Sequence, residues 1–126
     1  MKTHFISGHL DLTPEEFELH YEGRILEAIR EGGSFVVGDA RGTDHMAQQF
    51  LKKIIMDNML FDLDVTVFHM FESPRHNAGH FPTQGGYETD SVRDRAMTTA
   101  SENDIAWVRP GREKSGTARN LARRDR

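Results

Sequence analysis

The chain has 126 residues, of which 29% are charged and 37% hydrophobic, and its formal net charge is −4 at pH 7. This length suits one domain with a real hydrophobic core and is too short for two. No apolar run is long enough to cross a membrane, and residues 1–10 lack the features of a signal peptide. Because the chain has no cysteine, disulfides and thiolate chemistry are excluded, and the composition favours a cytoplasmic protein.

The charge is distributed unevenly along the chain. Residues 109–126 carry seven basic side chains against two acidic ones, a balance of +5, so the rest of the chain carries −9. A basic C-terminal segment is suited to phosphate, on a nucleotide or on nucleic acid. The alternative is a solvated helix face with its cations near the negative end of the helix dipole.

The first predicted elements are a strand and a helix. Residues 4–8 (HFISG) are typical of a short buried strand that ends at a glycine. Thr13, Pro14 and Glu16 then mark a helix start, with an N-cap, a proline at the first helical position and a capping box. Apolar residues follow at helical spacing until the glycine pair at residues 32–33 ends the helix.

Strands and helices alternate in the rest of the chain. We expect further strands at 34–38, 63–70 and 104–108, and helices at 45–58, at 88–100 and after the segment 115–117. Residues 71–87, with two prolines, three glycines and two histidines, are expected to form a long loop. The alternation predicts βαβ units, and therefore a single α/β Rossmann-like domain with a mainly parallel sheet and helices on both faces.

Ligands of such sheets bind beyond the carboxyl ends of the strands. Three of the four segments that follow predicted strands are rich in glycine and in small hydroxyl or charged residues, which allow close backbone approach to phosphate or ribose. The predicted ligand-binding residues come from these segments and from the 88–100 helix: Ser7, Gly8, His9, Gly38, Arg41, Gly42, Asp44, Arg95, Ser115, Gly116 and Thr117.

The segment Ser115-Gly116-Thr117 lies where the last loop meets a helix. Its glycine lets the backbone approach an anion, its hydroxyls are donors, and the N–H groups at a helix start add positive potential. A helix N-cap without a ligand is the alternative reading of the same residues.

Residues 38–44 (GDARGTD) are more informative. Their two glycines permit conformations barred to other residues, and Arg41 is a fork of donors suited to phosphate. Asp44 is suited either to a ribose hydroxyl or to capping the next helix, with Arg41 as its surface partner.

The helix at 88–100 carries Arg93 and Arg95, which are two residues apart and therefore point in different directions. Val92 and Ala96 are predicted to mark its inner face, and we assign Arg95 to the ligand.

The histidines do not predict a metal site. His69, His76 and His80 match no standard zinc spacing, and cysteine ligands are absent. We expect neither a metal nor a cofactor, and His9 is the better candidate for a sugar or phosphate contact.

Four motifs, taken in order, resemble those of the SLOG superfamily, whose Rossmann-like nucleotide-binding domains include YspA-like proteins and "lysine decarboxylase-like" phosphoribohydrolases. SGH at 7–9 resembles the first-strand glycine loop, and GDARGTD looks like GGARGAD with Asp39 in place of a glycine. VRDRAM at 92–97 resembles the Arg-x-x-Met helix, and PGREKSGT at 110–117 is similar to the Pro-Gly-Gly-x-Gly-Thr loop. The resemblance implies one nucleotide-binding domain over residues 1–126 that self-associates, since members often complete the site between subunits.

The chain departs from this family at one position that bears on catalysis. In the phosphoribohydrolases, a glutamate three residues after the glycine-threonine acts on the ribose as the N-glycosidic bond is cleaved, and here that residue is Asn120. An amide is neither a carboxylate nucleophile nor an equal stabiliser of an oxocarbenium charge. Glu113, Asp94 and Glu88 are the candidates for a replacement carboxylate.

Three functions are consistent with these residues. The first is a sensor or sequestering domain that binds a nucleotide or a nucleotide-derived small molecule. The second is an N-glycosidase, a hydrolase that releases free base from a nucleoside monophosphate. The third, nucleic-acid binding through the basic segment, is the weakest, because the chain is acidic overall and has only one Trp and two Tyr for base stacking.

Overall fold

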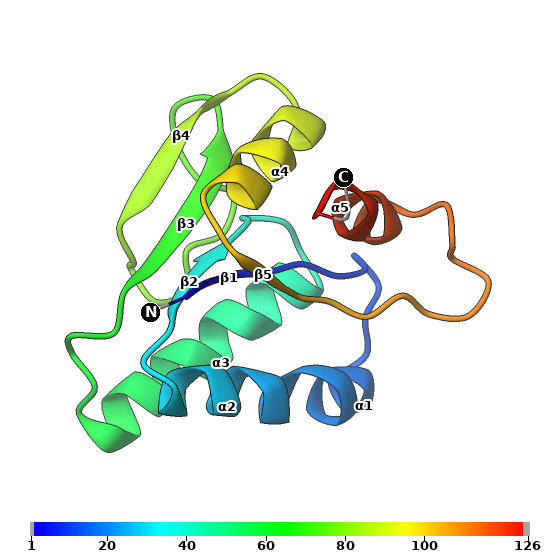
Figure 1. The fold of residues 1–126 in the computed structure, drawn as a ribbon. Coiled ribbons are helices and arrows are strands. Elements are labelled where there is room, and N and C mark those ends of the chain that lie inside the picture. Colours follow the sequence, from blue (N-terminus) through cyan, green and yellow to red (C-terminus); the bar gives the residue numbers. More distant parts are fainter. Residues whose placement is uncertain (1, 125–126) are drawn as a thin grey trace.

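A five-stranded parallel sheet forms the centre of the fold in the computed structural model, which describes residues 2–124 (Figure 1). The strands lie in the order β4-β3-β2-β1-β5, and every neighbouring pair is parallel. Their bounds are β1 Thr3–Ile6, β2 Ser34–Val37, β3 Val65–Met70, β4 Thr83–Tyr87 and β5 Asn103–Ile105.

Helices cover both faces of this sheet (Figure 1). The lower layer contains α1 Pro14–Phe17, η1 Glu18–Glu22, α2 Gly23–Arg30 and α3 Thr43–Asn58, and the other layer contains α4 Asp90–Thr99 and α5 Gly116–Arg124. The predicted α/β Rossmann-like fold is thereby confirmed. Within residues 2–124, none of the helices combines the length and the apolar character needed to cross a membrane.

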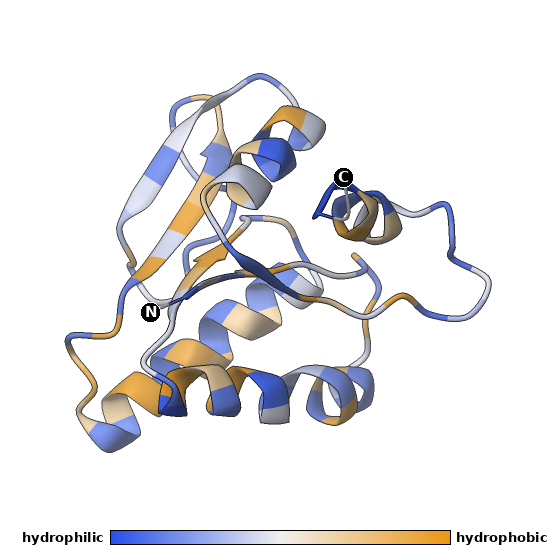
Figure 2. Ribbon diagram, in the orientation of Figure 1, coloured by the Kyte–Doolittle hydropathy of each residue, from blue (hydrophilic) through white to orange (hydrophobic). Residues whose placement is uncertain are grey.

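The sheet separates two apolar clusters. Phe5, Val36 and Phe68 point to one face, where Met97 of α4 packs on them. The opposite faces of the same strands build the larger cluster with α1, η1, α2 and α3, in which Tyr21 is fully buried. Because side chains alternate across a strand, the central strands are apolar on both faces, and Figure 2 shows β3 as largely hydrophobic.

The first helix begins as its sequence predicts. The Thr13 hydroxyl accepts a hydrogen bond from the Glu16 N–H at 3.1 Å, and the Glu16 carboxylate accepts one from the Thr13 N–H at 2.9 Å. This capping box satisfies two donors at the helix end, so local sequence is enough to start the helix.

Strand β4 corrects one prediction, since residues 71–87 were expected to be a loop throughout. Thr83 and Gln84 pair with Val67 and Phe68 of β3, which makes Thr83–Tyr87 the edge strand. Its residues TQGGY are exposed up to the final tyrosine and have no apolar alternation. The strand is held by backbone pairing with β3 rather than by burial, and hydropathy patterns cannot detect such a strand.

Candidate functional site

A cavity of about 550 Å³ lies beyond the carboxyl ends of the central strands. Strand β1 lies between β2 and β5, and the chain moves to opposite sides of β1 when it forms these two strands. Strand order therefore reverses at β1, and the connections on its two sides use opposite faces of the sheet. Open α/β sheets bind their ligands at such a switch point.

Eight of the predicted ligand-binding residues line this cavity. They are Ser7, Gly8, His9, Arg41, Asp44, Ser115, Gly116 and Thr117. They come from the segments after β1, β2 and β5, so the fold brings together three stretches that are far apart in the sequence.

Gly38, Gly42 and Arg95, by contrast, do not line the cavity. Gly42 has φ 73°, and a Cβ atom there would lie 2.3 Å from the Leu10 carbonyl oxygen, so this glycine allows the loops after β1 and β2 to meet. A Cβ on Gly38 would lie 2.5 Å from Asp44 Oδ2. Both glycines shape the wall of the site instead of facing a ligand.

The buried face of the helix α4 also differs from the prediction, which placed Val92 on the inner face. Arg93 and Met97, one helical turn apart, are 5% and 1% exposed, whereas Val92 is 43% exposed. The Thr89 hydroxyl caps α4 by accepting a hydrogen bond from the Val92 N–H. The two arginines do point in different directions, but Arg93 lines the cavity, and Arg95 faces a separate groove.

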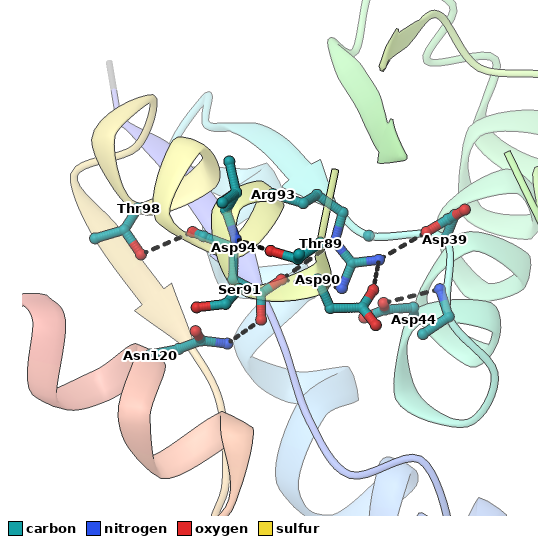
Figure 3. Close-up of polar contacts among 12 residues, drawn as sticks. Asp39, Asp44, Thr89, Asp90, Ser91, Arg93, Asp94, Thr98 and Asn120 are labelled. Atoms are coloured by element: carbon teal, nitrogen blue, oxygen red, sulfur yellow. Dashed lines mark hydrogen bonds and ion pairs between the residues drawn. The ribbon is translucent and has the colours of Figure 1, made fainter. Parts of the chain in front are cut away.

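Arg93 lies among several carboxylates (Figure 3). Its guanidinium donates to Asp39 Oδ1 at 2.7 Å and to Asp94 Oδ1 at 2.9 Å, and it lies 3.1 Å from Asp90. Arg75 joins the same network by donating to Asp39 and to Asp90, both at 2.8 Å. Burial by itself raises the pKa of Asp39, but the hydrogen bonds from Arg75 and the charges of Arg75 and Arg93 together hold the pKa below its ordinary value.

Asp44 is nearly buried and accepts a hydrogen bond from the Ala40 N–H at 3.1 Å. Burial raises the pKa of Asp44 to about 7, against the opposing attraction of Arg93. Asp44 does not cap α3, because the N-cap residue is Gly42 and no side chain caps that helix. The alternative in which Asp44 is a cap paired with Arg41 is therefore wrong, and near neutral pH this cavity holds a carboxyl group that can donate a hydrogen bond.

Asn120 is 3% exposed and donates from Nδ2 to Asp94 Oδ2 at 3.2 Å. Asp94 lines the cavity, whereas Glu113 borders a separate surface depression and Glu88 is exposed outside the cavity. Of the three candidate carboxylates, the one that the structure brings to the cavity is Asp94, and its hydrogen-bond partner is the Asn120 amide.

The start of α5 contributes hydrogen-bond donors. The Ser115 hydroxyl accepts from the Ala118 N–H at 3.2 Å, so Ser115 caps the helix, as the alternative reading of this segment proposed. The N–H groups of Gly116 and Thr117 lie in the first turn, where no carbonyl of the same helix can accept them. Ser7 is 5% exposed, and its hydroxyl has no hydrogen-bond partner among residues 2–124.

Arg41 differs in its ion pairing from three other arginines that line the cavity. Arg75, Arg93 and Arg112 each pair with an aspartate. Arg41 is exposed and pairs with no carboxylate of the described residues. Sequence reasoning missed Arg75 and Arg112. Arg112 lies in the basic PGREKSGT segment, and this basic character was a usable signal. Arg75 lies in a segment whose path no local sequence pattern predicts.

His9 joins the loops after β1 and β5. Its Nε2 accepts a hydrogen bond from the Arg109 N–H at 2.8 Å, and burial lowers its pKa. The ring is therefore neutral near pH 7, with its proton on Nδ1, and only that nitrogen is left as a donor. In the described part of the chain, no three His, Asp or Glu side chains cluster in a way that could hold a metal ion.

Tyr21 connects the loops after β1 and β5 through hydrogen bonds of its hydroxyl group. Its hydroxyl donates to the Ser7 carbonyl at 2.7 Å and accepts from the Trp107 N–H at 3.0 Å, and the residue is fully buried.

Replacing Tyr21 with phenylalanine should lower the free energy of unfolding by about 1–3 kcal/mol, because two buried backbone groups lose their partner. Urea denaturation checks this, with Tyr87→Phe as the matched control, because the Tyr87 hydroxyl accepts a hydrogen bond from Gln84 in an exposed position. Equal losses in the two variants would contradict the role of Tyr21.

The fold and this cavity define an α/β Rossmann-like domain with a lined crevice at its switch point. No protein-family model, curated protein or solved structure matches the chain. Membership of the SLOG superfamily therefore stays a prediction that rests on the four sequence motifs.

Proposed function

We propose that the chain binds a nucleotide or a nucleotide-derived small molecule in this cavity, as a sensor or sequestering domain. One observation carries the proposal: donors without a partner among residues 2–124 line the cavity from three loops. They are the Ser7 hydroxyl, the N–H groups at the start of α5, and the Arg41 guanidinium. A helix start and an arginine that line the same cavity are suited to a phosphate group.

The carboxyl groups of the cavity suit the sugar of the same ligand. Asp44 and Asp94 both line the cavity, and carboxylate oxygens accept hydrogen bonds from hydroxyl groups. A phosphate on the basic groups and a ribose on the acidic groups would account for why the cavity contains both kinds of side chain.

The N-glycosidase alternative has one observation in its favour. Asp44, with a pKa of about 7, and the carboxylate of Asp94 resemble the acid and base that glycosidic cleavage requires. Both oxygens of Asp94 are engaged, however, one by Arg93 and the other by Asn120. A carboxylate held in this way is a better acceptor for a hydroxyl than a nucleophile, and this favours binding without cleavage.

Nucleic-acid binding is less favoured for a different reason. Four arginines of the basic segment are engaged by acceptors within the fold: Arg109, Arg112, Arg123 and Arg124. These side chains are less available for a phosphate backbone than the charge of the segment suggests.

Incubation with a mixed panel separates the first two functions. Pure protein is mixed with nucleoside monophosphates, ADP-ribose and cyclic ADP-ribose, and the mixture is then separated by chromatography. We expect one compound to be retained intact with the protein. A new free-base peak would instead establish the glycosidase, and substitution of Asp94 with asparagine would then have to abolish that peak.

The phosphate contacts are tested by Arg41→Ala, which removes the guanidinium, and by Thr117→Val, which removes the hydroxyl that Thr117 adds to the N–H donors at the start of α5. Each should weaken the affinity for the retained compound roughly 10- to 100-fold, since a hydrogen bond to a charged group contributes about 1.5–3 kcal/mol. Calorimetric titration measures this, and thermal unfolding checks that both variants remain folded. Arg95→Ala is the control, because it removes an exposed arginine outside the cavity. Unchanged affinity in both test variants would reject the proposal.

A further inference from the structure

A second cavity adjoins the first at the same edge of the sheet. It has a volume of about 640 Å³ and begins where β3 ends, with Met70 and Phe71 in its wall. Since all strands are parallel, the carboxyl end of β3 lies on the same side as those of β1 and β2. Two strand spacings separate β3 from β1, a distance of about 10 Å that one extended nucleotide covers.

Arg75 connects the two cavities, because its side chain lines both. It is held between Asp39, which borders the second cavity, and Asp90, which borders the first. The side chain is 44% exposed and forms a wall that the two cavities share.

Phe71 has two unusual properties. Its side chain is 63% exposed, and its backbone has φ 54°, a left-handed conformation that is strained for a bulky residue. Two hydrogen bonds to β4 hold it there: its N–H donates to the Tyr87 carbonyl at 3.1 Å, and its carbonyl accepts from the Gly86 N–H at 2.8 Å. The fold thus maintains an aromatic ring at the edge of this cavity against its conformational preference.

From these positions we infer that the second cavity binds the base of the nucleotide whose phosphate and sugar occupy the first, with the base stacked on Phe71. An aromatic side chain can stack on any nucleobase, and a guanidinium such as that of Arg75 can also stack on a planar ring. Glu72 and Ser73 line the same cavity and are suited to hydrogen bonds with the edge of a base. The inference rests on the proposed function, since it assigns the base of the same ligand.

The test compares ligands that carry a base with one that does not. AMP, GMP, CMP, UMP and ribose 5-phosphate are titrated calorimetrically into the wild type, Phe71→Ala and Phe61→Ala. Phe61 is the matched control, because it is a similarly exposed phenylalanine, at 66%, that lines neither cavity. Thermal unfolding confirms that both variants are folded.

We expect at least one nucleoside monophosphate to bind the wild type more tightly than ribose 5-phosphate does. Phe71→Ala should weaken that binding roughly 5- to 100-fold and leave ribose 5-phosphate unchanged, while Phe61→Ala should alter neither. If ribose 5-phosphate binds as tightly as every monophosphate, or if Phe71→Ala has no effect, the base site is rejected and the phosphate site stands. If no compound binds the wild type, the proposed function itself fails, and the base site fails with it.

Discussion

Replacing Arg93 with alanine should lower the free energy of unfolding by about 3–5 kcal/mol. Arg93 is 5% exposed and pairs with Asp39, Asp90 and Asp94, and it also attracts the buried Asp44. Without this cation, Arg75 is the one charged partner that Asp39 keeps among residues 2–124, and Asp94 loses its ion pair with Arg93. Charges that are buried without compensation make such substitutions strongly destabilising.

Urea denaturation of Arg93→Ala and Arg95→Ala measures this effect. The two arginines are on the same helix, but Arg95 is exposed, so its loss should change the free energy of unfolding by less than about 0.5 kcal/mol. Arg93→Lys, which keeps the charge but not the planar fork, should lie between the wild type and Arg93→Ala. Equal stability of Arg93→Ala and Arg95→Ala would show that the carboxylate network does not depend on Arg93.

The Asp44→Asn variant should be more stable than the wild type at high pH. Burial raises the pKa of Asp44 from 3.8 to about 7 in the folded protein, so between these values the folded state keeps a proton that the unfolded state has released. The stabilising contribution of protonated Asp44 is complete below pH 3.8 and is lost as the pH rises through 7. At 1.36 kcal/mol per pKa unit, the wild type loses up to about 4 kcal/mol over this range, and the neutral amide avoids the loss.

Denaturation from pH 4 to pH 9 measures the pH dependence. The two proteins should be almost equally stable near pH 4, and their difference should grow up to about pH 7 and then level off. Asp57→Asn, on an exposed part of the same helix, is the control and should show a difference of less than about 0.5 kcal/mol throughout. A difference between Asp44→Asn and the wild type that does not change with pH would contradict the raised pKa.

Much of the fold follows from short stretches of sequence. The helix start at Thr13 needs only residues that are three positions apart, and the apolar runs of β1 and β2 predict buried strands without knowledge of their neighbours. The glycine and hydroxyl content of the loops likewise indicated the edge of the sheet where the cavity lies. These features are predictable because caps and hydrophobic patterns act between residues close in the sequence.

Other features depend on contacts between residues that are far apart. The sequence of β4 has no strand pattern, and pairing with β3 alone makes it a strand. The choice of Arg93 over Arg95 depends on how α4 is rotated on the sheet, which Met97 and the carboxylates around Arg93 determine together. A one-residue error in that rotation exchanges the buried and exposed positions, so helical spacing alone could not decide between them.

By itself, therefore, the sequence determined the α/β class, the start of the first helix and the loops that carry phosphate-binding residue types. The tertiary structure alone decided which arginine enters the cavity, that Gly42 allows two loop backbones to meet, and that Asn120 contacts Asp94, 26 positions away in the chain. The physical reason is range: helix caps and hydrophobic periodicity act between residues close in the sequence, whereas strand pairing, burial and charge pairing are defined only when distant segments pack together.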